Sequence, residues 1–336
     1  DPQKQFAAEF TESYGTVSPE INWMTATCDT VQTDFGLLDN SKTYTIQFYT
    51  ADPCSELSYC YLLAEYTGIN GGVVKDFFID YPSGLENVFV TVKDDDGTSY
   101  TSQYKTTVKE PVVFDPGHPD VGFRQHDAMR YRIGFEGFVG DDRLDFDYND
   151  AVIEIEYVRG RATATVKALA AGSVCATQIA YHRSGVFGQG DEDVIFEEMH
   201  EAVGFKGIFD YAEKRIVYYC INTGINNTNK YSSTEIDLKN DANASILTIA
   251  PKFYAYFTIP SKNKKEEDRV TVAYIPQRKG CQYPQAIMIA DPTWAWLNES
   301  KRISAGYSGF RKWLVDPIGY PLWYGAKNWK EANKNN

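Results

Sequence analysis

The sequence predicts a mostly β fold: a small N-terminal Ig-like β-sandwich followed by a larger β-sandwich domain with a few short helices. Aromatic residues make up 15% of the 336 residues, including 24 Tyr and 19 Phe, and such side chains pack well on a pleated sheet. Short stretches in which apolar and polar residues alternate recur along the chain, as in half-buried strands. Turn signals rich in Gly, Asn and Asp separate these stretches, as in a sandwich of short strands.

The first elements are expected to be a short helix and a strand. Residues 5–14 carry Phe6 and Phe10 without a strong turn signal, and Gly15 supplies the helix end. Apolar side chains alternate over Thr43 to Thr50, which predicts a strand with one face in the core.

Two hairpins are expected next. A strand over residues 59–66 leads into Asn70-Gly71-Gly72, a strong hairpin signal, so residues 73–79 are expected to return beside it.

The second hairpin has an acidic tip. Valine occupies every second position from Val88 to Val92, and the turn Asp94-Asp95-Asp96-Gly97 sends the chain back through residues 99–107. Three acids in a row suggest a metal site, but Asp-Gly at the tip of a hairpin is mainly turn chemistry. We therefore expect an ordinary turn here.

A proline-rich segment divides the chain. Three prolines lie within residues 111–119, where they remove backbone donors and keep the chain extended. We expect a first domain over residues 1–110 that includes the leading helix, a linker over 111–120, and a second β domain over 121–336. The elements expected in the second domain are strands over residues 131–138, 151–158 and 162–169, one or two helical turns within 191–202, and a helix over 300–314.

Charge and cysteine usage exclude several classes of protein. The 46 acidic and 33 basic residues give a formal net charge of −13, which repels a phosphate backbone, so no nucleic acid partner is expected. No stretch reaches the roughly 18 apolar residues of a membrane span. The six cysteines lack the spacing of zinc or redox sites. Cys54 and Cys60 could pair in an oxidising compartment, and free thiols are the equal alternative.

One acidic run predicts a metal site. Asp145, Asp147 and Asn149 alternate, and Asp150 follows directly before an expected strand. Crowded carboxylate and amide oxygens repel each other unless a hard cation lies among them, and Ca2+ binds about six to eight such oxygens. We expect a structural calcium loop. The alternative is a solvated acidic turn whose side chains bond to nearby backbone groups.

The remaining ligands are expected from the preceding segment, where Glu136 or Asp142 could complete the shell. An EF-hand has a similar spacing of oxygen ligands, but it needs Gly where this chain has Asp150. It also needs a helix after the loop, whereas residues 152–155 are rich in β-branched side chains. The sequence therefore favours a calcium loop that leads into a strand.

Aromatic residues gather in the C-terminal part of the chain. Five of the six tryptophans lie there, at Trp294, Trp296, Trp313, Trp323 and Trp329. Large aromatic side chains more often fill a core than bind a ligand, so a buried cluster is the main interpretation. The alternative is a platform that stacks on sugar rings, for which Trp294, Trp296 and Trp323 are the candidates.

Several motifs occur in order over nearly the whole chain. They are Phe10 to Gly15, Pro19 to Trp23, Phe135-Glu136, Asp145 to Val152, His200 to Gly204, Ile287 to Trp296, and the aromatic positions from Ile303 to Trp313. This combination resembles the LruC-type domain, a domain of unknown function in exported lipoproteins and surface proteins of Gram-negative bacteria. Gly137 and Gly306 depart from that family's pattern.

The resemblance implies export to the outer membrane or cell surface, with membrane contact only through a lipid anchor upstream of Asp1. It also implies a β-rich ligand or adhesion module rather than an enzyme. We therefore expect a non-enzymatic binding protein with a structural calcium loop, whose partner is a glycan or a surface protein. A carbohydrate-binding module that uses the C-terminal aromatics is the alternative, and a polysaccharide hydrolase, which needs two converging carboxylates, is a weaker one.

Overall fold

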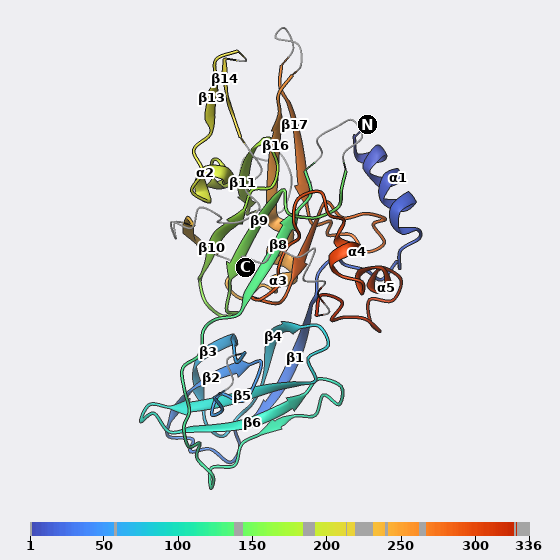
Figure 1. Cartoon of the computed structure of the whole chain (residues 1–336). Coiled ribbons are helices and arrows are strands. Elements are labelled where there is room, and N and C mark those ends of the chain that lie inside the picture. Colours follow the sequence, from blue (N-terminus) through green and yellow to red (C-terminus); the bar gives the residue numbers. More distant parts are fainter. Residues whose placement is uncertain are drawn as a thin grey trace.

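The protein consists of two β-rich units, a small one formed by β1 to β7 and a larger one above it in Figure 1. The computed structural model describes residues 2–56, 59–137, 144–183, 192–212, 214–218, 231–238, 241–261, 267–325 and 327. Antiparallel sheets dominate and the helices are few and mostly short. The predicted fold class is confirmed.

Two sheets face each other in the small unit. One has the order β4 (Val74–Pro82), β1 (Ala26–Asp34), β7 (Val112–Val113), and the other β3 (Leu62–Asn70), β2 (Thr43–Tyr49), β5 (Asn87–Asp94), β6 (Ser99–Lys105). Phe77 of the first sheet contacts Phe48 and Tyr66 of the second, with ring centroids 5.9 and 5.2 Å apart. Aromatic side chains on alternate positions therefore fill the space between the sheets.

One of the two predicted hairpins is wrong. Strands β5 and β6 pair across the acidic turn as expected, but β3 pairs with β2 while β4 pairs with β1. The turn at residues 70–72 therefore carries the chain from one sheet to the other. The partner of β4 was not predicted, because most side chains of β1 are polar and its apolar alternation is weak.

The proline-rich segment is part of the small unit rather than a free linker. Val112 lies beside Thr33 in a short parallel pair, and Phe114 packs against Phe35 with ring centroids 5.7 Å apart. Asp120 accepts hydrogen bonds from the backbone N and side-chain Oγ1 of Thr101 at 2.9 and 2.8 Å. The prolines are tolerated because β7 is only two residues long.

The larger unit also has two main sheets. The five-stranded one has the order β15 (Ser233–Asp237), β10 (Thr163–Ala170), β9 (Ala151–Glu156), β8 (Arg130–Phe135), β18 (Ala286–Ile289), and the four-stranded one β12 (Glu192–Phe196), β11 (Ala176–His182), β16 (Phe253–Ile259), β17 (Arg269–Tyr274). The strands predicted around β8, β9 and β10 are confirmed. A separate hairpin joins β13 (Ile208–Asp210) to β14 (Arg215–Val217).

The helices of the larger unit are short. They are α2 (Met199–Ala202), α3 (Ile246–Ile249), the 3-10 turn η2 (Ala250–Lys252), α4 (Ile303–Gly306) and α5 (Phe310–Val315). The helical turns expected within 191–202 are α2 alone, because the stretch before it forms β12. The single helix expected over 300–314 is divided into α4 and α5, although its four predicted core residues, Ile303, Tyr307, Phe310 and Leu314, are all buried.

The leading helix α1 (Pro2–Tyr14) lies on the larger unit, not on the sandwich with which it was grouped. Its Phe6 and Phe10 rings meet Phe146 edge to face, with centroids 5.3 and 5.4 Å apart. The chain then runs beside β18, where the Met288 N–H donates to the Trp23 carbonyl oxygen at 3.0 Å. Burial of two Phe rings against the larger core explains this placement.

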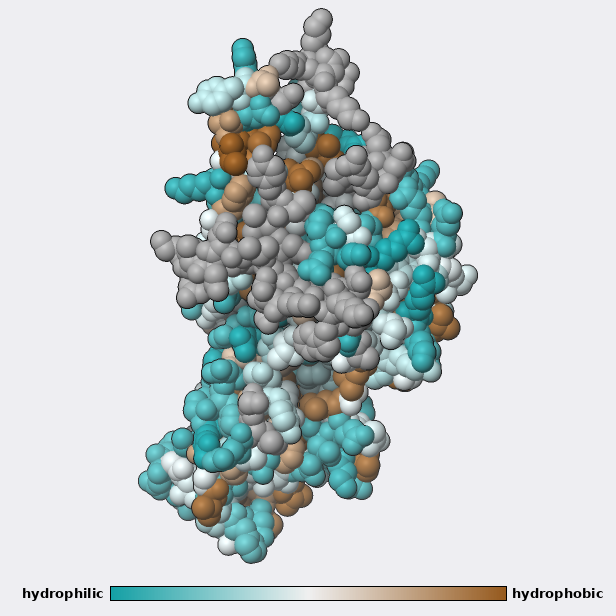
Figure 2. All heavy atoms as spheres, in the orientation of Figure 1, coloured by the Kyte–Doolittle hydropathy of each residue, from teal (hydrophilic) through white to brown (hydrophobic). Residues whose placement is uncertain are grey.

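The face of the molecule in Figure 2 is mostly hydrophilic, in keeping with the acidic composition. Apolar side chains gather at the β13–β14 hairpin, where Ile208, Phe209 and Ile216 are exposed. Among the described residues, no helix combines the length and the apolar character needed to cross a membrane.

Candidate metal centre

The acidic loop leads into β9, as the sequence predicts. Two of its residues, separated by one position, have a left-handed backbone conformation. Phe146 and Tyr148 have φ values of 53° and 54°, a left-handed conformation that costs an L-residue about 1–2 kcal/mol. Both aromatic side chains are buried, and burial of a large apolar side chain contributes about 1.5–3 kcal/mol, which offsets that cost. Gly134 allows the loop to fold back on β8, because a Cβ there would lie 2.3 Å from the Tyr148 carbonyl oxygen.

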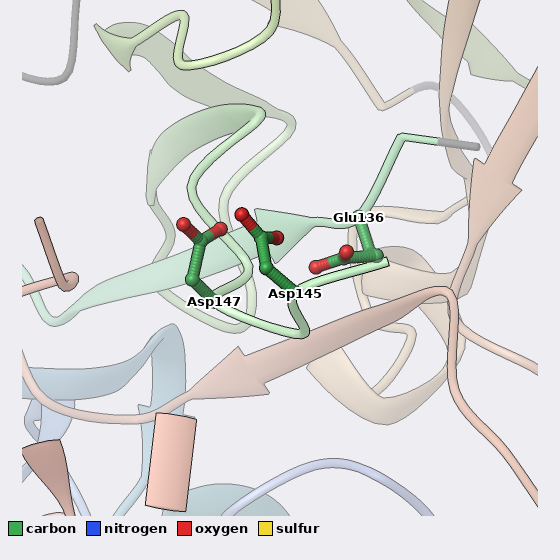
Figure 3. A group of neighbouring side chains, drawn as sticks. All are labelled: Glu136, Asp145 and Asp147. Atoms are coloured by element: carbon green, nitrogen blue, oxygen red, sulfur yellow. The ribbon is translucent and has the colours of Figure 1, made fainter. Parts of the chain in front are cut away.

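Three carboxylates converge beside this loop. One oxygen each from Glu136, Asp145 and Asp147 lies within 4.8 Å of the others. Figure 3 shows Asp145 between the other two. Oxygens on opposite sides of one Ca2+ are at most about 5 Å apart, because each Ca–O bond is about 2.3–2.6 Å long. The three oxygens are therefore spaced closely enough to bind a single ion.

Backbone N–H groups hold two of these carboxylates in place. Glu136 accepts at Oε1 from Phe146 N at 3.1 Å and at Oε2 from Tyr148 N at 3.2 Å. Asp147 accepts at Oδ2 from Ser300 N at 3.0 Å, which ties the loop to a segment near the C-terminus. The carboxylates are thus oriented by the fold and do not turn away from one another.

Asn149 and Asp150 also lie at the site. The Asn149 amide donates from Nδ2 to Asp147 Oδ2 at 2.8 Å and to the Leu297 carbonyl oxygen at 3.1 Å. Its Oδ1 has no hydrogen-bond partner, although Asn149 is 0% exposed. Asp150 accepts from Gly137 N at Oδ2, at 2.5 Å. All five residues that the sequence singled out therefore lie in one buried region.

A sixth oxygen ligand candidate was missed. Glu299 is half buried and its Oε2 has no hydrogen-bond partner. This oxygen lies at most 5.2 Å from Asn149 Oδ1, since a Cβ placed on Gly172 would be 2.9 Å from the Glu299 oxygen and 2.3 Å from the Asn149 oxygen. No local pattern marks Glu299, because it is brought to the loop only by the tertiary fold.

The electrostatics of the cluster are unbalanced. Burial raises the pKa of Glu136 well above its usual range, and the neighbouring carboxylates, with Asp150 the strongest, raise it further. Burial and then negative neighbours also raise the pKa of Asp147 and Asp150. For Glu299 the same causes raise the pKa to about 7. Acids that oppose one another's ionisation in this way would be stabilised in their charged form by a cation placed among them.

No salt bridge relieves this repulsion within the described ranges, since no Lys or Arg there pairs with these carboxylates. The contrast with Glu154, another buried acid, is direct. Glu154 accepts from Arg132 Nε at 2.9 Å, and a buried acid is normally paired in this way. The acids of the cluster therefore lack a positively charged partner like the Arg132 side chain that pairs with Glu154.

The donor set has the chemistry of a site for a hard cation. It consists of carboxylate and amide oxygens, which hard cations prefer, whereas zinc prefers histidine and cysteine. The buried, unpartnered Asn149 Oδ1 is the kind of atom that a bound ion would satisfy. Asp142, the other ligand suggested by the sequence, lies outside the described residues.

The proposed tryptophan platform is wrong and the core interpretation holds. Trp294, Trp296 and Trp323 are 0, 2 and 3% exposed, so their ring faces cannot stack on a sugar. Trp323 instead packs against Phe310 and Trp313, with ring centroids 5.0 and 5.3 Å apart. Trp329 lies outside the described residues.

Cys54 and Cys60 carry free thiols, so the suggested disulfide between them is absent. The Cys60 thiol donates instead to the Ala51 carbonyl oxygen at 3.3 Å, and burial raises the pKa of this thiol to about 12.

Comparison of the chain with protein-family models found no match, and comparisons with curated proteins and with solved structures found none either. The resemblance to the LruC-type domain therefore stays a prediction that rests on the sequence motifs.

Proposed function

We propose that this protein is a non-enzymatic binding protein of the cell surface whose larger β unit is stabilised by calcium at the Glu136, Asp145, Asp147 cluster. The observation that carries the calcium part is the burial of these acids without a counter-charge. A divalent cation would bind the carboxylates that otherwise repel one another. It would thereby connect β8, the acidic loop and the segment near Ser300.

The role of this calcium is structural rather than catalytic. Glu136 and Asp147 are 2 and 1% exposed and Asp145 is partly buried, so a polysaccharide could not reach the oxygens of the first two. A hydrolase needs its two carboxylates on either side of a bound glycosidic bond. The buried position of the cluster therefore favours a stabilising ion over a reaction centre.

The binding role is supported by two observations of different kinds. The motifs that resemble those of the LruC-type domain imply export and an adhesion or ligand-binding module. The exposed apolar side chains of the β13–β14 hairpin suit contact with another molecule, because such patches often mark interaction surfaces. We propose a glycan or a surface protein as the partner.

The calcium part is tested by melting the purified protein in EDTA and then with calcium or magnesium added back. At a calcium concentration 100-fold above Kd, the expected gain is about 2.7 kcal/mol. For a unit of this size the gain corresponds to a rise in Tm of roughly 5–10 °C. Magnesium should raise Tm less, because it keeps several of its waters and prefers a tighter octahedral shell.

The binding part is tested separately with the calcium-loaded protein on a glycan array and on outer-membrane protein fractions. Reproducible binding that calcium chelation weakens would support the proposal. An unchanged Tm in EDTA and calcium would overturn the metal role, and hydrolysis of any arrayed glycan would overturn the non-enzymatic one.

A further inference from the structure

We propose that the acidic cluster binds two calcium ions rather than one. The first lies between Glu136, Asp145 and Asp147, and the second beside Glu299 and the Asn149 amide oxygen. This inference rests on the proposed calcium site and adds its stoichiometry and its second set of ligands.

The charge of the cluster exceeds what one ion can balance. Its five carboxylates are those of Glu136, Asp145, Asp147, Asp150 and Glu299, and one Ca2+ neutralises only two of them. Together with Asn149 Oδ1 they offer more side-chain oxygens than the roughly six to eight that one calcium ion binds. A second divalent ion would bring the charge of the cluster close to neutral.

The orientation of Asn149 is fixed by its neighbours. Its Nδ2 faces two acceptors, Asp147 Oδ2 at 2.8 Å and the Leu297 carbonyl oxygen at 3.1 Å. A reversed amide would place an oxygen against both of them, which would be repulsive. The unpartnered atom is therefore the oxygen, and it points away from Asp147.

A second unpartnered oxygen lies near that one. Asn149 Oδ1 and Glu299 Oε2 lie 2.3 and 2.9 Å from the point where a Gly172 Cβ would be, so the two oxygens are at most 5.2 Å apart. Neither has a hydrogen-bond partner. A buried acceptor without a donor is unfavourable, and a cation within reach of both oxygens would satisfy them.

Asp145 is the ligand that the two positions could share. One of its oxygens lies within 4.8 Å of oxygens of Glu136 and Asp147. A carboxylate has two oxygens and can bind one ion with each, so the second oxygen of Asp145 remains for the second ion.

The test is a calcium titration of the EDTA-treated full chain by calorimetry at about pH 8, with the bound metal also counted by elemental analysis. Two ions per chain are expected for the parent protein and one for Glu299→Gln. Gly172→Ala, whose added methyl would press on both unpartnered oxygens, should also bind one. Glu235→Gln, at an exposed site on β15, is the matched control and should still bind two.

The outcomes separate this inference from the proposed function. One ion per chain in both the parent and Glu299→Gln would overturn the second site while leaving the calcium site intact. A protonated Glu299 that donates to Asn149 Oδ1 would give that result. No bound calcium in the parent would overturn both proposals. A folded Glu299→Gln variant that still binds two ions would also overturn the assignment.

Discussion

The chain contains two acidic runs of similar composition, and the fold treats them in opposite ways. At the tip of the β5–β6 hairpin, Lys42 Nζ binds Asp94 Oδ2 at 2.7 Å and Asp96 Oδ2 at 2.8 Å. Burial alone would raise the pKa of Asp94, but the Lys42 ammonium and the backbone N–H groups of Thr98 and Asp96 together outweigh it, and the pKa falls below its usual value. At the site before β9, burial and then like charges raise the pKa of Glu136 and Asp147.

The difference shows that composition does not define a metal site. The acids of the hairpin turn are satisfied by one lysine and by backbone N–H groups, although Asp94 is buried. Acids in a core need a partner of opposite charge, and in this protein the described residues provide none for the second run. The predictions below test whether a cation makes that difference.

The largest effect is expected from Asp147→Ala. This change removes a ligand and the acceptor for Ser300 N, so the calcium-dependent gain of about 2.7 kcal/mol should disappear. The matched change Asp96→Ala, at the exposed turn, should alter stability by no more than about 0.5 kcal/mol. Thermal melts of both variants with calcium and with EDTA measure the contrast. Equal losses in the two variants would argue against a special role for the buried run.

A smaller effect of opposite sign is expected from Asp145→Asn. In EDTA this variant should melt about 2–4 °C above the parent, because it removes one of the mutually repelling buried charges, worth about 1 kcal/mol. Calcium should then raise its Tm less than it raises that of the parent. A variant less stable than the parent in EDTA would show that repulsion between the carboxylates does not govern the stability of the metal-free protein.

The pH dependence should reverse when calcium is removed. In the metal-free protein the pKa of Glu299 rises from 4.5 to about 7 on folding, so the folded chain binds more protons than the unfolded one. Its contribution to stability is full below pH 4.5 and is lost as the pH rises toward 7. In excess calcium, protons compete with the ion, so stability should instead fall as the pH drops. Thermal melts at several pH values, with calcium and with EDTA, would show whether the two curves of Tm against pH slope in opposite directions. Parallel curves would contradict the prediction.

The smallest effect is expected from Lys42→Met. Asp94 and Asp96 lose their shared cation, but Asp96 is exposed and Asp94 still accepts from Asp96 N and Thr98 N at 3.1 and 2.9 Å. Salt also screens the exposed pair between Lys42 and Asp96. Tm should change little and should not depend on calcium. A calcium-dependent Tm shift in this variant would mean that the hairpin turn is itself a metal site.

Local sequence patterns predicted the parts of the fold that depend on local structure. The alternation of Asp145, Asp147 and Asn149 located the acidic loop, and Gly15, with φ of 79°, ended the first helix as expected. Long-range packing decided the rest. Strand β1 was missed because its side chains are mostly polar, and the pairing of β4 then followed from β1 rather than from the Gly-rich turn before it.

The candidate site shows the same limit. Glu136 lies just before the loop and could be proposed from sequence, whereas Glu299 lies far along the chain with no motif around it. The sequence could not distinguish a buried tryptophan cluster from a sugar-binding platform, because both need the same residues. The burial of these side chains in the fold decided between the two. What the sequence lacked in both instances was information on which distant segments meet.

The hydrogen bond from Ser300 to Asp147 spans 153 positions of the chain, which has a consequence for biosynthesis. While the protein is being made, the acidic loop emerges long before the segment that completes its surroundings. Until that segment arrives, Asp147 lacks the backbone donor that holds its carboxylate in place. The acidic loop can therefore reach its final geometry only after the chain has been synthesised to Ser300 and that segment has folded back. A cation at this loop, as we propose, would then be enclosed late in folding.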